Sequence, residues 1–167
     1  MSTDTATTTQ VHRVWIKASP ERVWDAITKP EWIDRYGYGG IPDWGDDPQP
    51  GPYSIEAGTG MQAGGHSGAV VDGEVVAADR PHRFVLTWRM LMDDGLKAEG
   101  FTRLVYDVHP MDNGVTRLTI THELDGAPNL SAIVGGQLAD MGAGGGWAWV
   151  LSDLKSLLET GEPLGAW

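Results

Sequence analysis

The chain has 167 residues, of which 41% are hydrophobic, so it is long enough for one sizeable core and too short to favour two domains. Its 12 basic and 23 acidic residues give a net charge of -11. Because this charge repels phosphate backbones and anionic lipid surfaces, we expect no nucleic-acid partner and no membrane partner. A small neutral, apolar or cationic partner fits the charge better.

The N-terminal residues 1–10 are polar and carry neither the basic region nor the apolar core of a signal peptide. No apolar run approaches the roughly 20 residues of a membrane span. The absence of cysteine excludes disulfides and is compatible with a reducing cytosol. We therefore predict a cytoplasmic protein with a disordered polar leader at residues 1–10, a single domain at 11–161 and a C-terminal tail at 162–167.

A strand and a capped helix are predicted at the start of this domain. Val14, Ile16 and Ala18 recur with the two-residue period of a strand that buries one face. Ser19 is a favoured N-cap residue, and Pro20 fits the first helical position, where no amide hydrogen is missed. The helix then carries one apolar stripe, and a short second helix is predicted at residues 29–36.

A long loop at residues 37–52 follows, rich in glycine, proline and aspartate. It contains two aromatic residues, Tyr38 and Trp44, which are unusual in such a segment. Long ordered loops are often functional. The alternative is a surface excursion that its aromatic side chains simply fasten to the domain.

Five strands are predicted in the rest of the chain, at residues 53–57, 68–78, 83–90, 101–109 and 115–123. Turn sequences separate most of them, including Asn113-Gly114, which favours a hairpin and therefore an antiparallel meander. Residues 146–160 then change to a helical period with a tryptophan, valine and leucine stripe. The whole order predicts an α+β domain in which a curved antiparallel sheet wraps around a long C-terminal helix.

Four sequence stretches support a family resemblance, namely ASPERVWDA at 18–26, GEV at 73–75 followed by RP at 80–81, LTW at 86–88 and LKSLLETG at 154–161. With the element order, they resemble the START/Bet v 1-like helix-grip superfamily, also called SRPBCC. Within it, the chain is similar to the activator of Hsp90 ATPase homologue-like branch. The resemblance covers residues 11–161.

This resemblance implies a hydrophobic pocket between the sheet and the C-terminal helix. Members of the superfamily bind lipids, hormones or polyketides, and a minority catalyse cyclisation, dehydration or hydrolysis. The branch takes its name from a co-chaperone that carries an additional chaperone-docking domain, and we expect no such domain in this chain. We therefore do not infer from the resemblance that this chain activates a chaperone.

Strand alternation places Trp88, Met90, Tyr106 and His122 on inward faces, independently of the family. A neutral imidazole at His122 could orient a ligand or transfer a proton. The alternative is a core histidine that is bonded to a backbone carbonyl or to Tyr106. Tyr106 has the same two interpretations, because a buried phenol needs a partner that either the protein or a ligand supplies.

Four further residues complete the predicted ligand-binding set. Met61 adapts to irregular shapes, Tyr53 opens a predicted strand, and His66 lies in a glycine-rich segment that could reach a pocket mouth, although an exposed loop histidine is the alternative. Trp147 begins the terminal helix behind glycine-rich residues 142–146, which would serve either as a gate or as a plain linker. For Trp88, Met90 and Met61 the competing interpretation is ordinary core packing.

No metal site and no cofactor are predicted. The five histidines show no close pairing, and cysteine ligands are absent. Glu99 and Asp25 are the carboxylates nearest apolar sequence; we expect Asp25 to be solvated and Glu99 to form a charged hairpin edge rather than to act as a general base.

Three functions remain open at this stage. The leading hypothesis is a non-catalytic protein that binds a small hydrophobic or amphipathic molecule under the terminal helix. The second is an enzyme of the polyketide cyclase, dehydratase or hydrolase type that uses His122 as its acid-base group. The third is a chaperone-assisting or protein-interaction module with an exposed apolar patch, for which the outward-facing Trp15 is the hint, and a homodimer through such residues is also open.

Overall fold

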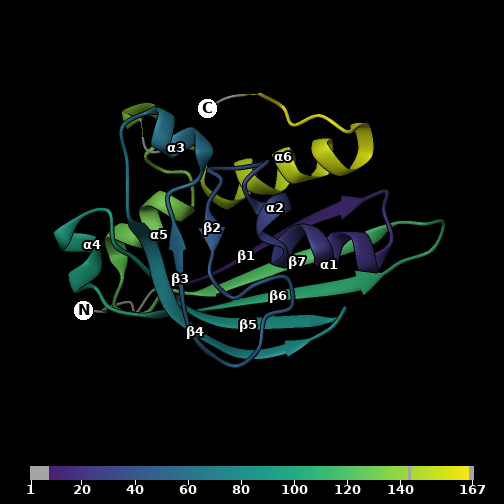
Figure 1. The fold of residues 1–167 in the computed structure, drawn as a ribbon, viewed down its shortest axis with the longest axis horizontal. Helices are drawn as coiled ribbons and strands as arrows, with labels where there is room; N and C mark the ends of the chain where they lie inside the picture. The colour runs from purple at the N-terminus through teal and green to yellow at the C-terminus, as the bar shows by residue number, and fades with distance from the viewer. Residues whose placement is uncertain (1–7, 143, 166–167) are drawn as a thin grey trace, which may run out of the picture.

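The computed structural model describes residues 8–142 and 144–165 (Figure 1). Its strands are β1 (Thr9–Ile16), β2 (Ile41–Pro42), β3 (Gly51–Glu56), β4 (Ala69–Asp79), β5 (Arg83–Met90), β6 (Thr102–Pro110) and β7 (Thr116–Glu123). Its α-helices are α1 (Pro20–Thr28), α2 (Pro30–Ile33), α3 (Thr59–Ala63), α4 (Asp94–Ala98), α5 (Pro128–Val134) and α6 (Gly146–Thr160), and η1 (Ala139–Met141) is a 3-10 helix.

The strands form one antiparallel sheet in the order β1-β7-β6-β5-β4-β3-β2. The sheet is open, with β1 and β2 at its edges. Figure 1 shows it curving beneath α6, which runs across its concave side together with α1 and α2. The predicted α+β architecture, an antiparallel meander around a long C-terminal helix, is confirmed.

The N-terminal boundary of the domain differs from the prediction. Residues 1–7 of the expected leader lie outside the described part, as do residues 166 and 167 of the expected tail. Thr9 and Gln10, however, belong to β1, where they pair with Glu123 and His122 of β7. The side-chain amide of Gln10 also donates to the Ser131 carbonyl at 2.8 Å. These two residues are ordered because β7 offers them a complete strand ladder, which the polar sequence did not reveal.

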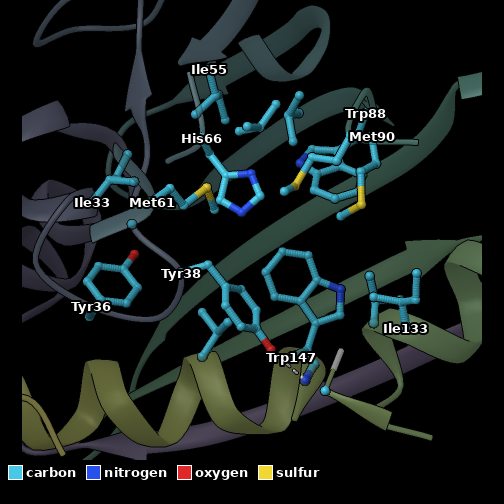
Figure 2. A pocket seen from close by; sticks show the side chains of 18 of the residues that line it. Ile33, Tyr36, Tyr38, Ile55, Met61, His66, Trp88, Met90, Ile133 and Trp147 are labelled. Atoms are coloured by element: carbon cyan, nitrogen blue, oxygen red, sulfur yellow. Dashed lines mark hydrogen bonds between the residues drawn. The ribbon is translucent and has the colours of Figure 1, made fainter. Parts of the chain in front are cut away.

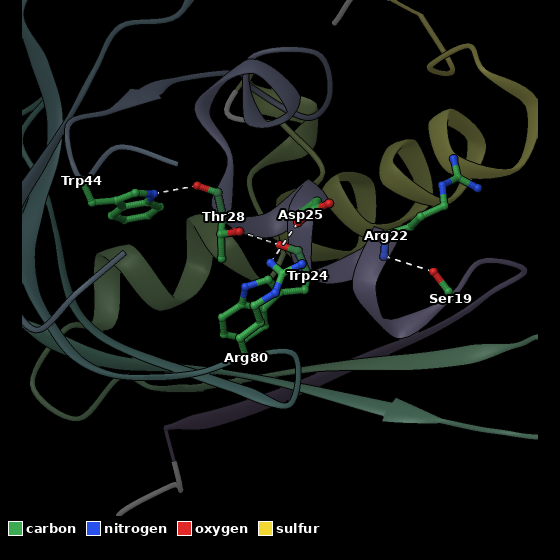
Figure 3. Close-up of polar contacts among 7 residues, drawn as sticks. All are labelled: Ser19, Arg22, Trp24, Asp25, Thr28, Trp44 and Arg80. Atoms are coloured by element: carbon green, nitrogen blue, oxygen red, sulfur yellow. Dashed lines mark hydrogen bonds and ion pairs between the residues drawn. The ribbon is translucent and has the colours of Figure 1, made fainter. Parts of the chain in front are cut away.

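The first helix begins where its cap predicts. The Ser19 hydroxyl accepts a hydrogen bond from the Arg22 amide at 3.2 Å, and Pro20 occupies the first turn (Figure 3). Trp24 is 1% exposed and its ring lies edge-on to Phe84 of β5, with ring centroids 5.8 Å apart. The Asp25 side chain keeps 30% of its surface exposed, in line with the expectation that it is solvated, and it also pairs with Arg80 at 3.1 Å because the β4–β5 turn brings this cation over α1 (Figure 3).

The terminal helix buries its predicted stripe. Leu151, Leu154, Leu157 and Leu158 are each at most 4% exposed, and all but Leu157 belong to the main core cluster. The helix ends at Gly161, whose φ of 85° is the left-handed conformation that glycine adopts at helix ends. Each buried leucine of this kind contributes about 2 kcal/mol by removing apolar surface from water, so the stripe explains why α6 stays seated on the sheet.

The loop at residues 37–52 is fastened at its start and near its middle. Trp44 donates from its indole to the Thr28 carbonyl at 2.6 Å, and its ring packs against Phe84 at 5.3 Å between centroids (Figure 3). At the start of the loop, the buried Asp153 carboxylate of α6 accepts a hydrogen bond from the Gly37 amide at 2.7 Å. Trp44 therefore has the fastening role that the sequence left open.

Helices α3, α4 and α5 and the 3-10 helix were not predicted, and one of them changes the interpretation of Glu99. This residue follows α4, and its carboxylate accepts hydrogen bonds from the Asn129 and Leu130 amides, each at 3.0 Å. It therefore satisfies the first amides of α5 and does not form a charged hairpin edge. The prediction was wrong because the partner helix lies 30 residues further along the chain. No helix among the described residues has the length and apolar character that crossing a membrane requires.

Candidate ligand-binding pocket

A pocket of about 470 Å³ lies between the concave face of the sheet and the N-terminal half of α6. The sheet contributes side chains from β3, β4, β5 and β6, and the short helices α3 and α5 close its ends. Its lining consists of Ile33, Tyr36, Tyr38, Gly39, Ile55, Met61, His66, Val70, Val71, Trp88, Met90, Met92, Tyr106, Ile133, Val134, Gly142, Gly146, Trp147 and Val150 (Figure 2).

The structure brings together most of the residues that the sequence singled out. Six of them line the pocket, and these are Met61, His66, Trp88, Met90, Tyr106 and Trp147. Figure 2 shows the His66 ring pointing into the space between Met61 and Trp147. Trp88 and Tyr106 both lie beside Trp147, with centroid distances of 6.4 Å in each case. Two predicted residues, Tyr53 and His122, lie outside the lining.

Tyr53 is a packing residue of β3 in this structure. It is 4% exposed, and its hydroxyl donates to the Thr87 carbonyl at 2.7 Å. Its ring packs against Trp44 at a centroid distance of 5.1 Å. The side chain therefore fastens the 37–52 loop and the β3 strand to the sheet, and its phenol is already satisfied by the protein.

His122 lies behind Trp147, fully buried, in a chain of hydrogen bonds. The Trp147 indole donates to Nδ1 at 3.1 Å, and Nε2 lies 2.7 Å from the Thr102 hydroxyl. An indole nitrogen is only a donor, so Nδ1 must be the acceptor and Nε2 must carry the proton. Thr102 then accepts from His122 and donates to the Trp88 carbonyl at 2.9 Å. The four groups satisfy one another completely.

This environment keeps the His122 imidazole neutral. Burial, with a smaller contribution from His12, lowers the pKa of His122 from 6.5 to about 3. Both ring nitrogens are engaged, and neither is available to a molecule in the pocket. The arrangement matches the structural alternative considered for this residue, with Thr102 and Trp147 as the partners in place of a backbone carbonyl or Tyr106.

Sequence reasoning missed two sources of the lining. Tyr36 and Tyr38 come from the turn after α2, and Ile133 and Val134 come from α5. The unusual aromatic Tyr38 was the available signal for the first source, because an exposed loop rarely retains a large ring without a reason. For the second source the seven-residue helix is too short to show a clear apolar period.

The pocket is apolar and carries no formal charge. Among the described residues that line it there is no aspartate, glutamate, lysine or arginine. Burial raises the pKa of the Tyr36 and Tyr106 hydroxyls above 10, so both phenols stay protonated at physiological pH. The described part of the chain also holds no group of three or more histidine or carboxylate side chains that could bind a metal ion.

Gly146 is the first residue of α6 and packs closely against the end of α5 at the pocket wall. Its φ is 68°, and a Cβ at this position would lie 2.1 Å from the Val134 carbonyl oxygen, so no other residue fits without displacing backbone. Its amide donates to the Tyr38 hydroxyl at 3.0 Å. Steric crowding therefore explains why glycine stands at the start of this helix. Residue 143 of the preceding glycine-rich stretch lies outside the described residues.

A curved antiparallel sheet, a long C-terminal helix and an uncharged pocket between them define a helix-grip protein. Residues 17–159 match the family model described as activator of Hsp90 ATPase homolog 1-like protein, and the chain belongs to this family. No curated protein matches the chain significantly.

Solved structures share this fold. Protein MLL2253 from Mesorhizobium loti is 22% identical, with a TM-score of 0.63 over 90% of this chain and 96% of that one. The Aha1 protein from Colwellia psychrerythraea, solved as a dimer in solution, is 19% identical, with a TM-score of 0.57 over 92% of this chain and 97% of that one. DynU16, a protein in the dynemicin biosynthetic locus, is 20% identical, with a TM-score of 0.54 over 93% of this chain and 49% of that one.

Proposed function

We propose that this protein binds a small hydrophobic or amphipathic molecule in the pocket under α6, as a cytoplasmic binding protein rather than an enzyme. The observation that carries the proposal is a pocket of about 470 Å³ lined by aromatic and aliphatic side chains without a charged group. Ligand sites have this character, with volumes of about 300–1,000 Å³ and a few polar groups among apolar ones.

Binding is favoured over catalysis because both ring nitrogens of His122, the predicted acid-base residue, are hydrogen-bonded to protein groups. A general acid or base must lie within hydrogen-bonding reach of the substrate. His122 lies behind Trp147 and uses both nitrogens for protein partners. DynU16 belongs to a biosynthetic locus, which favours the alternative of a cyclase, dehydratase or hydrolase. In this chain, such an enzyme would need an acid-base side chain other than His122.

A pocket-filling substitution tests the proposal. Val71 on β4 lines the pocket and is 6% exposed, whereas Val76 on the same strand is 52% exposed and lies outside the lining. We expect Val71→Trp to abolish binding of uncharged aromatic and aliphatic probes, and Val76→Trp to leave it unchanged. Isothermal titration and native mass spectrometry report binding, and circular dichroism confirms that both variants fold.

Two results would oppose the proposal. One is the absence of binding by the wild-type protein across lipids, polyketides and aromatic acids. The other is equal binding by the wild-type, Val71→Trp and Val76→Trp proteins, which would place the bound molecule elsewhere.

Self-association through the outer face of the sheet is a second proposal. Trp15 is 48% exposed on the edge strand β1, beside a groove that Arg13 and Arg117 also line. The dimeric state of the Colwellia relative supports self-association, and the exposed Trp15 is what suggests this face. Sedimentation of the wild-type protein should show a dimer that Trp15→Ser weakens; a monomer at all concentrations contradicts it.

A further inference from the structure

Three polar groups of the pocket lining have no protein partner. The Trp88 indole nitrogen, the Tyr106 hydroxyl and the His66 imidazole make no hydrogen bond with any residue in 8–142 or 144–165. Tyr106 is held only by ring contacts, at 6.0 Å to Phe84 and 6.4 Å to Trp147 between centroids. The Trp88 and Tyr106 atoms are not among the sealed polar atoms of the described residues, so a molecule in the pocket can reach them. His66 is an exposed loop residue at the pocket mouth, so solvent can satisfy its imidazole and the argument rests on the other two groups.

Other polar side chains of the same lining are satisfied by the protein. The Tyr36 hydroxyl donates to the Ala26 carbonyl at 2.9 Å, and the Trp147 indole donates to His122 at 3.1 Å. Buried polar groups in proteins are nearly always hydrogen-bonded, and leaving one without a partner is costly. Trp88 and Tyr106 differ from these side chains, because a bound molecule would supply the hydrogen-bond partner that the protein does not.

Two of these groups, Trp88 and Tyr106, flank one aromatic wall. Trp88 on β5 and Tyr106 on β6 each lie 6.4 Å from Trp147 between ring centroids, on neighbouring strands. Flat rings are attracted to such a wall by offset or edge-on contacts, which a flexible chain does not make. An indole N–H can only donate, so the atom that meets Trp88 must be an acceptor.

Charge restricts the ligand further. The described lining holds no carboxylate, lysine or arginine, so an ionised ligand would lose its hydration without gaining a counter-charge. An uncharged molecule avoids this cost.

We infer that the ligand is a planar, uncharged aromatic compound that carries oxygen acceptors, such as a ring ketone, a quinone or an aryl ether. Trp88 donates to one of these oxygens and Tyr106 bonds another, while the rings lie against Trp147. This inference rests on the proposed function and narrows it from hydrophobic molecules in general to one chemical class. It also assigns specificity to Trp88 and Tyr106.

A matched probe pair tests the inference. Fluorene and 9-fluorenone have the same tricyclic shape and differ by one carbonyl oxygen. The panel also includes 1-decanol as an uncharged chain and 9-fluorenone-2-carboxylate as a charged ring. Dissociation constants are measured for the wild-type, Tyr106→Phe, Trp88→Phe and Tyr53→Phe proteins. Tyr53 is the matched control because its hydroxyl is bonded to Thr87 outside the lining.

We expect the wild-type protein to bind 9-fluorenone about tenfold more tightly than fluorene, the scale of one hydrogen bond. At least one of Tyr106→Phe and Trp88→Phe should bring this ratio to within about twofold of unity, and Tyr53→Phe should leave it at about tenfold. Taking the ratio removes the effect of ring size in Trp88→Phe. The carboxylate and the alcohol should bind more weakly than 9-fluorenone.

Several results would contradict the inference without contradicting the proposed function. Equal affinity for fluorene and 9-fluorenone would mean that the open donors are not used. Tightest binding of 1-decanol or of the carboxylate would mean a different ligand class. A ratio unchanged in both pocket variants would remove Trp88 and Tyr106 from recognition. Failure of every probe to bind would instead contradict the proposed function itself.

Discussion

The indole nitrogen of Trp147 lies 3.1 Å from Nδ1 of His122 and donates a hydrogen bond to it. This contact joins the first turn of α6 to the end of β7, across 25 residues of sequence. It fixes the plane of the Trp147 ring, and this ring is the wall that faces the pocket. The histidine therefore serves binding indirectly, by orienting an aromatic side chain.

A first prediction concerns pH. The folded chain keeps His122 neutral down to about pH 3, whereas an unfolded histidine takes up a proton near 6.5. Between these values the unfolded state binds more protons, so the contribution of His122 to the free energy of unfolding is complete above pH 6.5 and is lost as pH falls toward 3. At pH 5 we expect a loss of about 2 kcal/mol relative to pH 7.5.

Urea unfolding at pH 7.5 and pH 5 measures this loss. The variant His122→Gln cannot titrate at this position, so its free energy of unfolding should fall less over the same interval. Other groups that titrate in this range, including His12, contribute to both proteins and cancel in the comparison. The same pH dependence in wild-type and variant proteins would show that His122 is not held neutral by the fold.

A second prediction concerns Trp147→Phe. This change removes the donor to His122 and leaves Nδ1 buried without a partner, which costs about 1–3 kcal/mol. Thermal or urea unfolding measures the loss. Trp15→Phe is the matched control, because Trp15 is 48% exposed and the same change there should stay within about 0.5 kcal/mol. Equal effects at the two positions would refute the structural role of the Trp147 contact.

A third prediction concerns Glu99→Ala. The change removes the carboxylate that accepts from the Asn129 and Leu130 amides, so α5 should be destabilised by about 1 kcal/mol. Hydrogen exchange of the α5 amides should accelerate. Because Ile133 and Val134 line the pocket, the affinity for an apolar probe should fall as well. The exposed Glu31→Ala is the control, and unchanged α5 exchange in Glu99→Ala would exclude the capping role.

A fourth prediction separates stability from binding. Tyr53→Phe removes the hydrogen bond to the Thr87 carbonyl, so the free energy of unfolding should fall by about 1 kcal/mol. Since Tyr53 lies outside the lining, the affinity for apolar probes should not change. A loss of affinity without a loss of stability would place Tyr53 in the ligand site after all.

The sequence predicted the parts of the fold that depend on local pattern. Ser19 and Pro20 mark the start of α1, and the alternation in β5 and β6 correctly placed Trp88 and Tyr106 on the concave face. These features follow from cap chemistry and from a two-residue period, which neighbouring residues alone determine.

The parts that escaped prediction depend on distant contacts. Helix α5 has only seven residues, and the distant Glu99 accepts hydrogen bonds from its first amides. The helix therefore has no local capping side chain by which its start could be predicted. The partners of His122 come from β6 and α6, and only the folded chain brings them together. The pocket role of Tyr38 likewise depends on Gly146, which lies 108 residues away in sequence.

The most direct test of the proposed binding site is an NMR titration of the indole N–H signals of the eight tryptophans with 9-fluorenone. The account predicts shifts for Trp88 and Trp147, which line the pocket, and an unchanged signal for the outward-facing Trp15. Eight unmoved signals, or a shift of Trp15 alone, would contradict it.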